Sequence, residues 1–407
     1  MQANTKHVFI LNSGSSSIKF RLYDMKEETL LVSGALERIG ETDSSIIYRN
    51  YTAASEMREH KEHVPVVDHI AALQQIIAFL HNSDNAIDLM QSLYAIGHRV
   101  VHGGDTFQAP TLINDDVIEN IRDMIPLAPL HNLANLAGIE ATRQRYPQVP
   151  QVAVFDTAFF RTLPPHADRY ALPDELYRDH HVRRYGFHGT SHQYVASQAA
   201  SYLQQPLKSL RLITLHLGNG ASAAAIRDGI CIDTSMGMTP LEGLIMGTRC
   251  GDLDPSVIFY LSRNLGMTLD EIETLLNHDS GMKGLCGVSD MREVHQLANK
   301  GDEQAGLAIE MYCYRICKYI GAYCTILGRL DALVFTGGIG ENDPLIRQLI
   351  CEKLSIFGVL LKQQKNSQGK TDISGNNSAV KVLVIPTNEE LEIARQTVAV
   401  IDKYNSD

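Results

Sequence analysis

Two turns of small polar residues have the composition of phosphate-binding loops. The first spans residues 12–19, where serine hydroxyls, Gly14 and the cation of Lys19 lie between two apolar runs. Glycine and short side chains let backbone N–H groups approach an anion closely. The second turn, at 216–220, repeats the order of strand, small turn and strand, with 11–17 aligning on 217–223. This echo predicts a duplicated unit with phosphate bound between the copies.

A further glycine-rich segment, 336–342, follows an apolar run and precedes a predicted helix. Gly338 and Gly340 within it suit a nucleotide that lies against a helix N-terminus, and a purely structural turn is the alternative. The chain contains no G-x-x-x-x-G-K-[ST] loop, and this segment does not open a dinucleotide-binding unit. Those two nucleotide-binding classes are therefore excluded.

Three cations occur where charge is unusual. Arg99 ends an apolar strand, Arg249 lies among glycines, and His188 lies in a glycine-containing turn. A guanidinium in an apolar strand favours an anionic partner. Each cation alone is explained equally well by a structural ion pair, but three on an acidic chain indicate convergence on one anion.

The candidate carboxylates are Asp156 and Glu389. Asp156 follows an apolar strand, where α/β proteins place catalytic groups, and helix capping is the alternative. Glu389 begins the last predicted helix, where the helix dipole alone would favour a carboxylate. His188 and His192 would have metal-ligand spacing on a helix, but Gly189 argues against a helix there, so no metal is expected at that pair.

The whole chain has the composition of a globular protein with two domains. It has 407 residues, of which 44% are hydrophobic and 20% charged, and a formal charge of −11. The acidic balance argues against nucleic-acid and anionic-membrane partners. No apolar run reaches the length of a signal-peptide core or a membrane span. Seven cysteines without paired CxxC spacing are typical of reduced thiols in the cytoplasm.

Hydrophobic patterning predicts a mixed sheet with helices on its faces in each half of the chain. In the first half, strands are expected near 7–12, 16–24, 29–36, 93–101 and 152–156, with a helix near 68–82. In the second half, strands are expected near 211–217, 221–227, 230–234, 331–336 and 382–385, with helices near 254–265, 268–277, 303–328 and 388–402.

Together these motifs resemble the acetate kinase family of short-chain acyl kinases. They include NSGSSSIK at 12–19, GHRVVHGG at 97–104, RRYGFHGTSH at 183–192, HLGNG at 216–220, FTGGIGEN at 335–342 and IPTNEE at 385–390. The resemblance implies a duplicated ribonuclease-H-like α/β fold, shared with sugar kinases, actin and the heat-shock ATPases. An N-terminal acyl-kinase domain (1–158 plus 388–407) and a nucleotide-binding domain (159–387) would have the active site in a cleft between them.

The same resemblance implies a role for each matching residue. Asp156, His188 and Arg249 would be catalytic, and Arg99, Val101 and His131 would bind the acyl substrate. ATP would be held by Lys19, His216, Leu217, Gly218, Asn219, Gly220, Asp290, Arg292, Gly338, Ile339, Gly340, Glu341 and Asn342. Asn12 and Glu389 would belong to the Mg²⁺ environment, with Mn²⁺ as an alternative ion.

Three departures from the family pattern concern local detail. Phe160 stands where many members have histidine, and Cys250 follows Arg249 where serine is usual. The 281–292 loop is one residue shorter than the common pattern. The first two bear on local packing, and the third bears on the assignment of Asp290 and Arg292.

The implied reaction is reversible, Mg²⁺-dependent phosphoryl transfer between ATP and acetate, giving acetyl phosphate and ADP, by a cytoplasmic homodimer. A propionate kinase and a sugar kinase on the same fold are alternatives, and a non-catalytic ATPase would have no need of Arg99. Val101, on the same strand face as Arg99, favours acetate as a pocket wall. Acetate is ionised at neutral pH, so Asp156 is expected to position Mg²⁺-bound water or Arg249 rather than to act as a general base.

Overall fold

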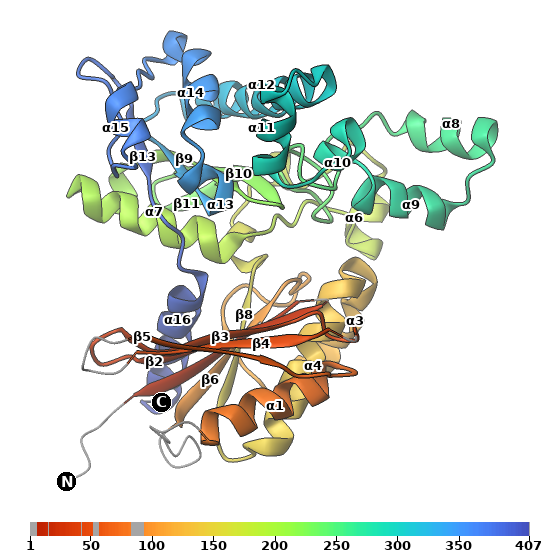
Figure 1. The fold of residues 1–407 in the computed structure, drawn as a ribbon, viewed down its shortest axis with the longest axis vertical. Coiled ribbons are helices and arrows are strands. Elements are labelled where there is room, and N and C mark those ends of the chain that lie inside the picture. Colours follow the sequence, from red (N-terminus) through yellow and green to blue (C-terminus); the bar gives the residue numbers. More distant parts are fainter. Residues whose placement is uncertain (1–5, 15, 42, 52–56, 83–92, 407) are drawn as a thin grey trace. The chain divides into compact units, whose positions relative to one another are not determined.

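The computed structural model describes residues 6–14, 16–41, 43–51, 57–82 and 93–406. The chain divides into two compact units (Figure 1). Unit 1 comprises Met1–Phe159 and Asn388–Asp407, and unit 2 comprises Phe160–Thr387. The chain leaves unit 1 one residue later than the sequence suggested and returns to it at residue 388.

Unit 1 is built on one eight-stranded sheet in the order β5-β4-β3-β2-β1-β6-β8-β7. The strands are β1 (His7–Ser13), β2 (Ser17–Asp24), β3 (Thr29–Glu37), β4 (Ser45–Tyr51), β5 (Met57–His63), β6 (Leu93–Val100), β7 (Thr111–Leu112) and β8 (Gln151–Phe155). The principal helices are α1 (His69–Asn82), α3 (Asp115–Asp123), α4 (Pro129–Arg145) and α16 (Glu389–Tyr404).

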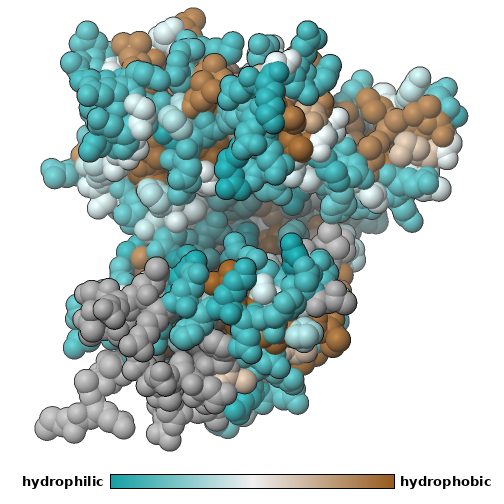
Figure 2. Space-filling view, viewed as in Figure 1, coloured by the Kyte–Doolittle hydropathy of each residue, from teal (hydrophilic) through white to brown (hydrophobic). Residues whose placement is uncertain are grey.

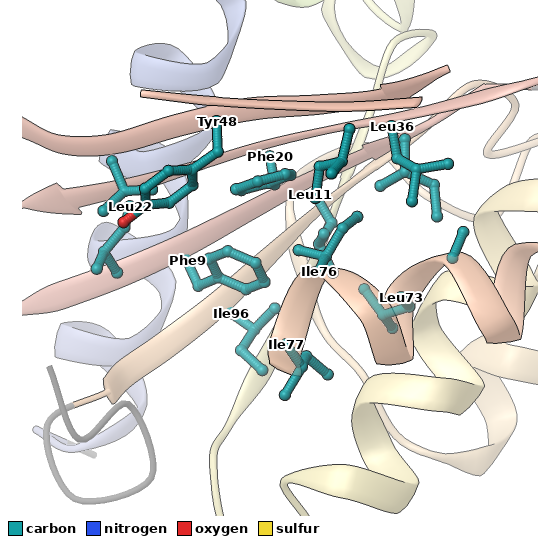
Figure 3. Packing of buried hydrophobic residues seen from close by; sticks show 14 of the residues in the cluster. Phe9, Leu11, Phe20, Leu22, Leu36, Tyr48, Leu73, Ile76, Ile77 and Ile96 are labelled. Carbon is teal, nitrogen blue, oxygen red and sulfur yellow. The ribbon is translucent and has the colours of Figure 1, made fainter. Parts of the chain in front are cut away.

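Helices cover both faces of this sheet. On one face, Phe9, Phe20 and Ile96 form a buried cluster with Leu73 and Ile76 of α1 (Figure 3). Successive residues of a strand point to opposite faces, so Gly97 faces the other side. A Cβ on Gly97 would lie 2.5 Å from Thr397 Oγ1 and 3.0 Å from Ile393 Cγ2, both on α16. Glycine at this position lets α16 pack directly against β6.

Unit 2 contains a five-stranded sheet in the order β11-β10-β9-β12-β13. The strands are β9 (Arg211–Leu217), β10 (Ala221–Arg227), β11 (Ile230–Thr234), β12 (Ala332–Thr336) and β13 (Lys381–Val384). The helices are α5 (Pro165–Asp168), α6 (Asp174–His180), α7 (Gly189–Leu203), α8 (Ser256–Leu265), α9 (Leu269–His278), α10 (Gly281–Cys286), α11 (Met291–Asn299), α12 (Glu303–Leu327), α13 (Gly337–Asn342), α14 (Pro344–Glu352) and α15 (Gln363–Ser367).

The two sheets share one topology, which confirms the predicted duplication. In unit 1, β1, β2 and β3 are antiparallel neighbours, and β6 and β8 continue the sheet parallel to β1. In unit 2, β9, β10 and β11 are antiparallel neighbours, and β12 and β13 continue it parallel to β9. This is the ribonuclease-H-like order expected from the sequence. Unit 1 adds β4, β5 and β7 at its edges.

Two further observations concern disulfide bonds and membrane-spanning helices. All seven cysteines are free of disulfide bonds. Among the described residues, no helix combines the length and apolarity that crossing a bilayer requires.

Because His98 is buried, we expect the free energy of unfolding of unit 1 to fall in acid. Its Nε2 lies 2.9 Å from Gln151 Oε1, and burial lowers the pKa of His98 from 6.5 to about 4. Between these two pKa values the unfolded chain holds more protons than the folded chain. The folded state therefore loses stability as the pH falls through this window, by about 3 kcal/mol in total.

Urea unfolding at pH 7 and pH 4.5 tests this expectation. In a His98→Gln variant, which cannot titrate at this position, the loss of unfolding free energy on acidification is expected to shrink by about 2 kcal/mol. An unchanged loss would show that His98 is not held in its neutral form.

Candidate active site

Three parallel strands of unit 1 place polar side chains at one sheet edge. Asn12 is the next-to-last residue of β1, and Arg99 is the next-to-last residue of β6. Asp156 directly follows β8. The carboxyl ends of parallel strands meet at the same edge, which is where such sheets bind ligands. The structure therefore brings these three predicted residues together.

Arg99 is the centre of this group. Its Nη2 donates to Asp156 Oδ2 over 2.6 Å, and its Nε lies 3.1 Å from the same oxygen. Its Nη1 donates to Asn12 Oδ1 over 3.2 Å. Glu389 Oε2 lies 3.8 Å from Arg99 Nε. The buried carboxylate of Asp156 thus occupies the Nε–Nη2 edge of the guanidinium, the edge that a bidentate carboxylate ligand would use.

The start of α16 fixes the position of Glu389. Asn388 is the N-cap of this helix, and its Oδ1 accepts a hydrogen bond from the Leu391 backbone N–H over 3.2 Å. The same oxygen accepts from Arg21 Nη1 over 2.9 Å. Arg21 lies on β2, so the cap ties the first turn of α16 to the sheet of unit 1.

Burial and neighbouring charges have opposing effects on the pKa values of Glu389 and Arg99. Burial raises the pKa of Glu389 to about 7, although Arg99 lowers it and Asp156 raises it further. Burial alone would lower the pKa of Arg99, but Asp156 and Glu389 outweigh that effect and raise it above its ordinary value. Arg99 is therefore a permanent cation that holds two carboxyl groups around it.

Two asparagines of α4 hold the backbone that follows Arg99. Asn135 Oδ1 accepts from the Val101 backbone N–H over 3.0 Å, and its Nδ2 donates to the Ser13 carbonyl over 2.7 Å. Asn132 bonds the backbone N–H and carbonyl of His102, each over 3.0 Å. The sequence analysis missed both asparagines, although their spacing of three residues on one helix face could have indicated them.

Two other predicted residues also lie in unit 1. Lys19, on β2, pairs directly with Asn12 across the antiparallel strands, and its charge lowers the pKa of Glu389. His131 lies in the first turn of α4, one residue before Asn132. The structure therefore gathers Lys19 with the Arg99 group.

In unit 2, predicted cations gather at the turn between β9 and β10. A Cβ placed on Gly220 would lie 3.4 Å from His188 Nε2 and 3.7 Å from Arg249 Nη1. The turn is closed by a hydrogen bond from the Gly218 backbone N–H to the Gly220 carbonyl over 2.9 Å. Glycine at position 220 keeps this space open to both side chains.

Arg249 differs from Arg99 in having no carboxylate partner among the described residues. Its Nη1 donates to the Pro240 carbonyl over 3.3 Å and lies 3.8 Å from Met246 Sδ. Burial lowers the pKa of Arg249, but a guanidinium remains charged at neutral pH. The described residues of unit 2 thus hold a half-buried cation without a carboxylate partner, which is a favourable position for an anionic ligand.

His188 lies at the N-terminus of α7, which corrects the sequence prediction. Gly189 is the first helical residue, and His188 is the N-cap with a φ of +59°. The prediction that Gly189 excludes a helix was wrong because a glycine in the first turn follows directly after the αL residue that turns the chain. His188 and His192 share Ser222 as a hydrogen-bond partner.

The glycine turn of 336–342 packs against the β9–β10 turn. A Cβ on Gly218 would lie 3.9 Å from both the Gly338 backbone N and His216 Nε2. Gly337 has a φ of +77°, and a Cβ there would lie 2.8 Å from the Leu217 carbonyl oxygen. Gly337 is therefore required both by conformation and by space, and it begins α13.

A cavity of about 760 Å³ opens beside these two turns. It is lined by Gly218, Asn219, Ser289, Asp290, Met291, Arg292, His295, Gly338, Ile339, Asn342 and Asp343. Asp290 and Arg292 form an ion pair of 2.5 Å at its rim. The cavity thus brings together seven of the predicted nucleotide-binding residues despite the shorter 281–292 loop.

Four cavity residues were not foreseen: Ser289, Met291, His295 and Asp343. His295 Nε2 and Asp343 Oδ2 form a contact of 2.6 Å in its wall. The hydrogen bond to Asp343 raises the pKa of His295. Asp343 also caps α14 through the Leu345 and Ile346 backbone N–H groups. Nothing in the local sequence indicated this pair because His295 lies on α11, whereas Asp343 lies between α13 and α14.

Several predicted ATP-binding residues do not line this cavity. They are Lys19, His216, Leu217, Gly220, Gly340 and Glu341. Glu341 Oε1 instead accepts hydrogen bonds from the Gly337 and Thr387 backbone N–H groups over 2.9 Å and 3.0 Å. Its carboxylate therefore fixes the glycine turn and the end of unit 2.

The two unusual residues have ordinary surroundings. The ring of Phe160 is buried and lies edge-on to the His192 ring with centroids 6.0 Å apart. The Cys250 backbone N–H donates to the Leu276 carbonyl over 3.2 Å. Both departures are thus accommodated by packing and backbone hydrogen bonding.

The available ligands fit a weakly held hard cation. The described residues contain no group of three or more His, Cys, Asp or Glu side chains that could hold a metal ion. Asn12 Oδ1 and the carboxyl of Glu389 offer oxygen atoms near Arg99. Mg²⁺ keeps water and phosphate oxygens as most of its ligands and needs few from the protein. These two side chains suit such an ion better than zinc.

Comparisons with known proteins agree with one another. The model of the Acetokinase family matches residues 7–395. Acetate kinase of Syntrophobacter fumaroxidans is 52% identical over 397 residues, which cover 97% of each chain. A solved propionate kinase from Francisella tularensis has a TM-score of 0.91 at 45% identity, covering 97% of this chain and all of that chain. Acetate kinase of Porphyromonas gingivalis has a TM-score of 0.89 at 42% identity, with the same coverage.

Proposed function

The chain belongs to the acetokinase family, and on that premise we propose that it transfers a phosphoryl group reversibly between ATP and acetate, giving acetyl phosphate and ADP. The observation that carries the proposal is the half-buried guanidinium of Arg249, which has no carboxylate partner among the described residues and lies with His188 beside Gly220. A transferring phosphoryl group is the anion that such a pair would stabilise.

Phosphoryl transfer depends on positioning and charge neutralisation more than on covalent work by the protein. In this proposal Arg249 and His188 donate to the equatorial oxygens of the moving group. Mg²⁺, held by Asn12 and Glu389, would supply neutralisation of the ATP oxygens. Arg99 orients acetate, and Asp156 holds Arg99 through its Nε–Nη2 edge. This role for Asp156 replaces the earlier hypothesis of positioning Mg²⁺-bound water or Arg249.

The nucleoside is assigned to the cavity beside Asn219 and Gly338. Its volume of about 760 Å³ lies within the range of ligand sites. The N-terminus of α13 and the Gly338 backbone N–H favour phosphate at one end. Asp290 and Arg292 at the rim are exposed and suit polar contacts with the ribose or base.

A hydroxylamine trap tests the reaction. The full chain is incubated with Mg-ATP and, separately, acetate, propionate, butyrate or glucose, and acyl phosphate is trapped as hydroxamate. Hydroxamate from acetate is expected. Absence of hydroxamate from every acid would end the acyl-kinase proposal. ADP formed only with glucose would indicate a sugar kinase, and ADP formed equally well without any added acceptor would indicate an ATPase that transfers the phosphoryl group to water.

Acetate is proposed as the preferred acid because Val101 is buried next to the Arg99 group. A Val101→Ala variant is expected to improve the kcat/KM for propionate relative to acetate by roughly 10-fold, since one methylene in an apolar pocket discriminates by 10–200-fold. The backbone bond to Asn135 does not depend on the side chain, so folding is expected to be retained. An unchanged ratio of kcat/KM values would remove Val101 from the pocket.

We also propose that the enzyme is a homodimer of the reducing cytoplasm, as the resemblance implies. Figure 2 shows hydrophobic surface over α8 and α9. Its exposed side chains include Phe259, Tyr260, Leu265 and Leu269. Such patches on soluble proteins often mark interfaces. Light scattering of the purified chain should give twice the mass of 45.1 kDa, and a monomer at micromolar concentration would contradict the proposal.

A further inference from the structure

A chain of hydrogen-bonding groups runs from His188 into the buried sheet of unit 2. His188 Nδ1 lies 2.9 Å from Ser222 Oγ, and the same Oγ lies 2.8 Å from His192 Nε2. His192 Nδ1 lies 2.7 Å from Thr214 Oγ1. Ser222, His192 and Thr214 are all 0% exposed. Bulk water therefore does not compete for these partners.

His192 is the neutral member of this chain. Burial lowers its pKa well below the ordinary value, and the nearby His216 lowers it further. A neutral imidazole donates from one ring nitrogen and accepts at the other. The tautomer of His192 therefore determines the orientation of the Ser222 hydroxyl. If Nε2 of His192 carries the hydrogen, Ser222 Oγ accepts it, and if Nδ1 carries the hydrogen, the Ser222 hydroxyl donates to Nε2.

The hydrogen bonds between His188, Ser222, His192 and Thr214 can run in one of two donor-to-acceptor directions. In one, His188 donates from Nδ1 to Ser222, Ser222 donates to His192 Nε2, and His192 donates from Nδ1 to Thr214. The Thr214 hydroxyl hydrogen then needs another acceptor. Among the described residues, His192 is the one hydrogen-bond partner recorded for Thr214 Oγ1. This order leaves a buried donor unsatisfied, which is costly.

The opposite order gives the side-chain hydrogens of Thr214, His192 and Ser222 an acceptor each. Thr214 donates to His192 Nδ1, His192 donates from Nε2 to Ser222, and Ser222 donates to His188 Nδ1. The hydrogen of a neutral His188 then lies on Nε2. This nitrogen is the one that lies with Arg249 Nη1 beside Gly220.

We propose that Thr214, His192 and Ser222 are positioning residues that hold His188 as the tautomer with its hydrogen on Nε2. The catalytic meaning of this inference rests on the proposed function. An N–H at Nε2 donates to an oxygen of the transferring phosphoryl group, whereas the other tautomer would turn a lone pair toward that oxygen. Ring stacking of His188 on His216, with centroids 4.3 Å apart, fixes the plane in which the donor points.

Nitrogen NMR of the full chain labelled with [¹⁵N]histidine tests the proposal without substrate. The resonances of His188 and His192 are assigned with His188→Gln and His192→Gln variants. In the parent protein, both rings are expected to carry hydrogen on Nε2 and to show an unprotonated Nδ1. Hydrogen on Nδ1 of either ring would overturn the proposal.

The steady-state kinetics of a Ser222→Ala variant provide a second test of the positioning role. Its kcat is expected to fall roughly 10-fold, with the KM values for ATP and acetate little changed, because a transition-state donor loses its orientation. Ser235→Ala is the matched control: this serine is also fully buried and loses a hydrogen bond from the Ala223 backbone N–H. Equal kcat values for the two variants would reject the positioning role. If the parent protein shows the Nε2–H signals of both histidines but forms no hydroxamate, the proposed function is rejected and the proposed tautomer is retained.

Discussion

Replacing Arg249 by alanine is expected to lower kcat by roughly 10³-fold or more, a loss typical of removing an arginine that faces a transferring phosphoryl group. The guanidinium is half-buried, and among the described residues it has no carboxylate to neutralise. Its removal therefore leaves no buried counter-charge behind in unit 2. We expect the unfolding free energy to change little in comparison with the loss of activity.

Steady-state kinetics in both directions measure this effect. Arg315→Ala is a suitable control because Arg315 also donates to a backbone carbonyl, that of Gly243, over 2.7 Å, but pairs with Asp252. The control should retain a kcat within about 10-fold of the parent. A loss in Arg249→Ala that is confined to KM would contradict a role in the transition state.

Replacing Asp156 by asparagine is expected to lower kcat by about 10²-fold without raising the KM for acetate. The neutral amide no longer holds the Nε–Nη2 edge of Arg99, where the carboxylate now lies at 2.6 Å. Acetate can then bind that edge in place of Asp156, away from its productive position. A general-base role predicts instead that activity recovers at high pH, so kcat is compared at pH 7 and pH 9. Parent-like activity in the variant would exclude any essential role.

The same substitution should lower the free energy of unfolding by about 3 kcal/mol, since Arg99 becomes a buried cation with one partner fewer. Asp402→Asn is the matched control in unit 1. Asp402 pairs with Lys6 at 2.7 Å, but its side chain is 46% exposed. Its loss should cost at most about 1 kcal/mol. If urea unfolding shows equal losses of unfolding free energy in the two variants, burial does not make the Arg99–Asp156 pair more stabilising than the Lys6–Asp402 pair.

The sequence predicted the repeated core of each unit because those strands are apolar runs with marked turns. It missed β4, which mixes apolar with polar residues, and β5, which is rich in charged residues such as Glu59 and Lys61. At this edge of the sheet β4 is hydrogen-bonded to β3, and β5 is hydrogen-bonded to β4. Pairing with the neighbouring strand, rather than an apolar pattern of their own, decides their conformation.

The sequence named most candidate site residues through motifs but not their mutual contacts. Arg99 and Asp156 were assigned separate roles, whereas they form one ion pair. Glu341 was assigned to ATP without its hydrogen bond to the Gly337 backbone N–H, through which its carboxylate closes a turn. Ser222 was passed over as one small residue among alanines. Such roles depend on the direction of a side chain across neighbouring strands, which motif spacing along one chain does not contain.

The asparagine clamp of α4 has a consequence for how this enzyme can change over evolutionary time. Asn135 holds the backbone N–H of Val101 and the Ser13 carbonyl, and neither bond involves the Val101 side chain. In the proposed function Val101 is the wall of the acid pocket, and it is attached to the scaffold through atoms that every amino acid except proline supplies. Single substitutions at this position can alter which acid is accepted while the Arg99 strand keeps its place. Substrate preference is thereby separated from catalytic geometry and can drift without loss of the reaction.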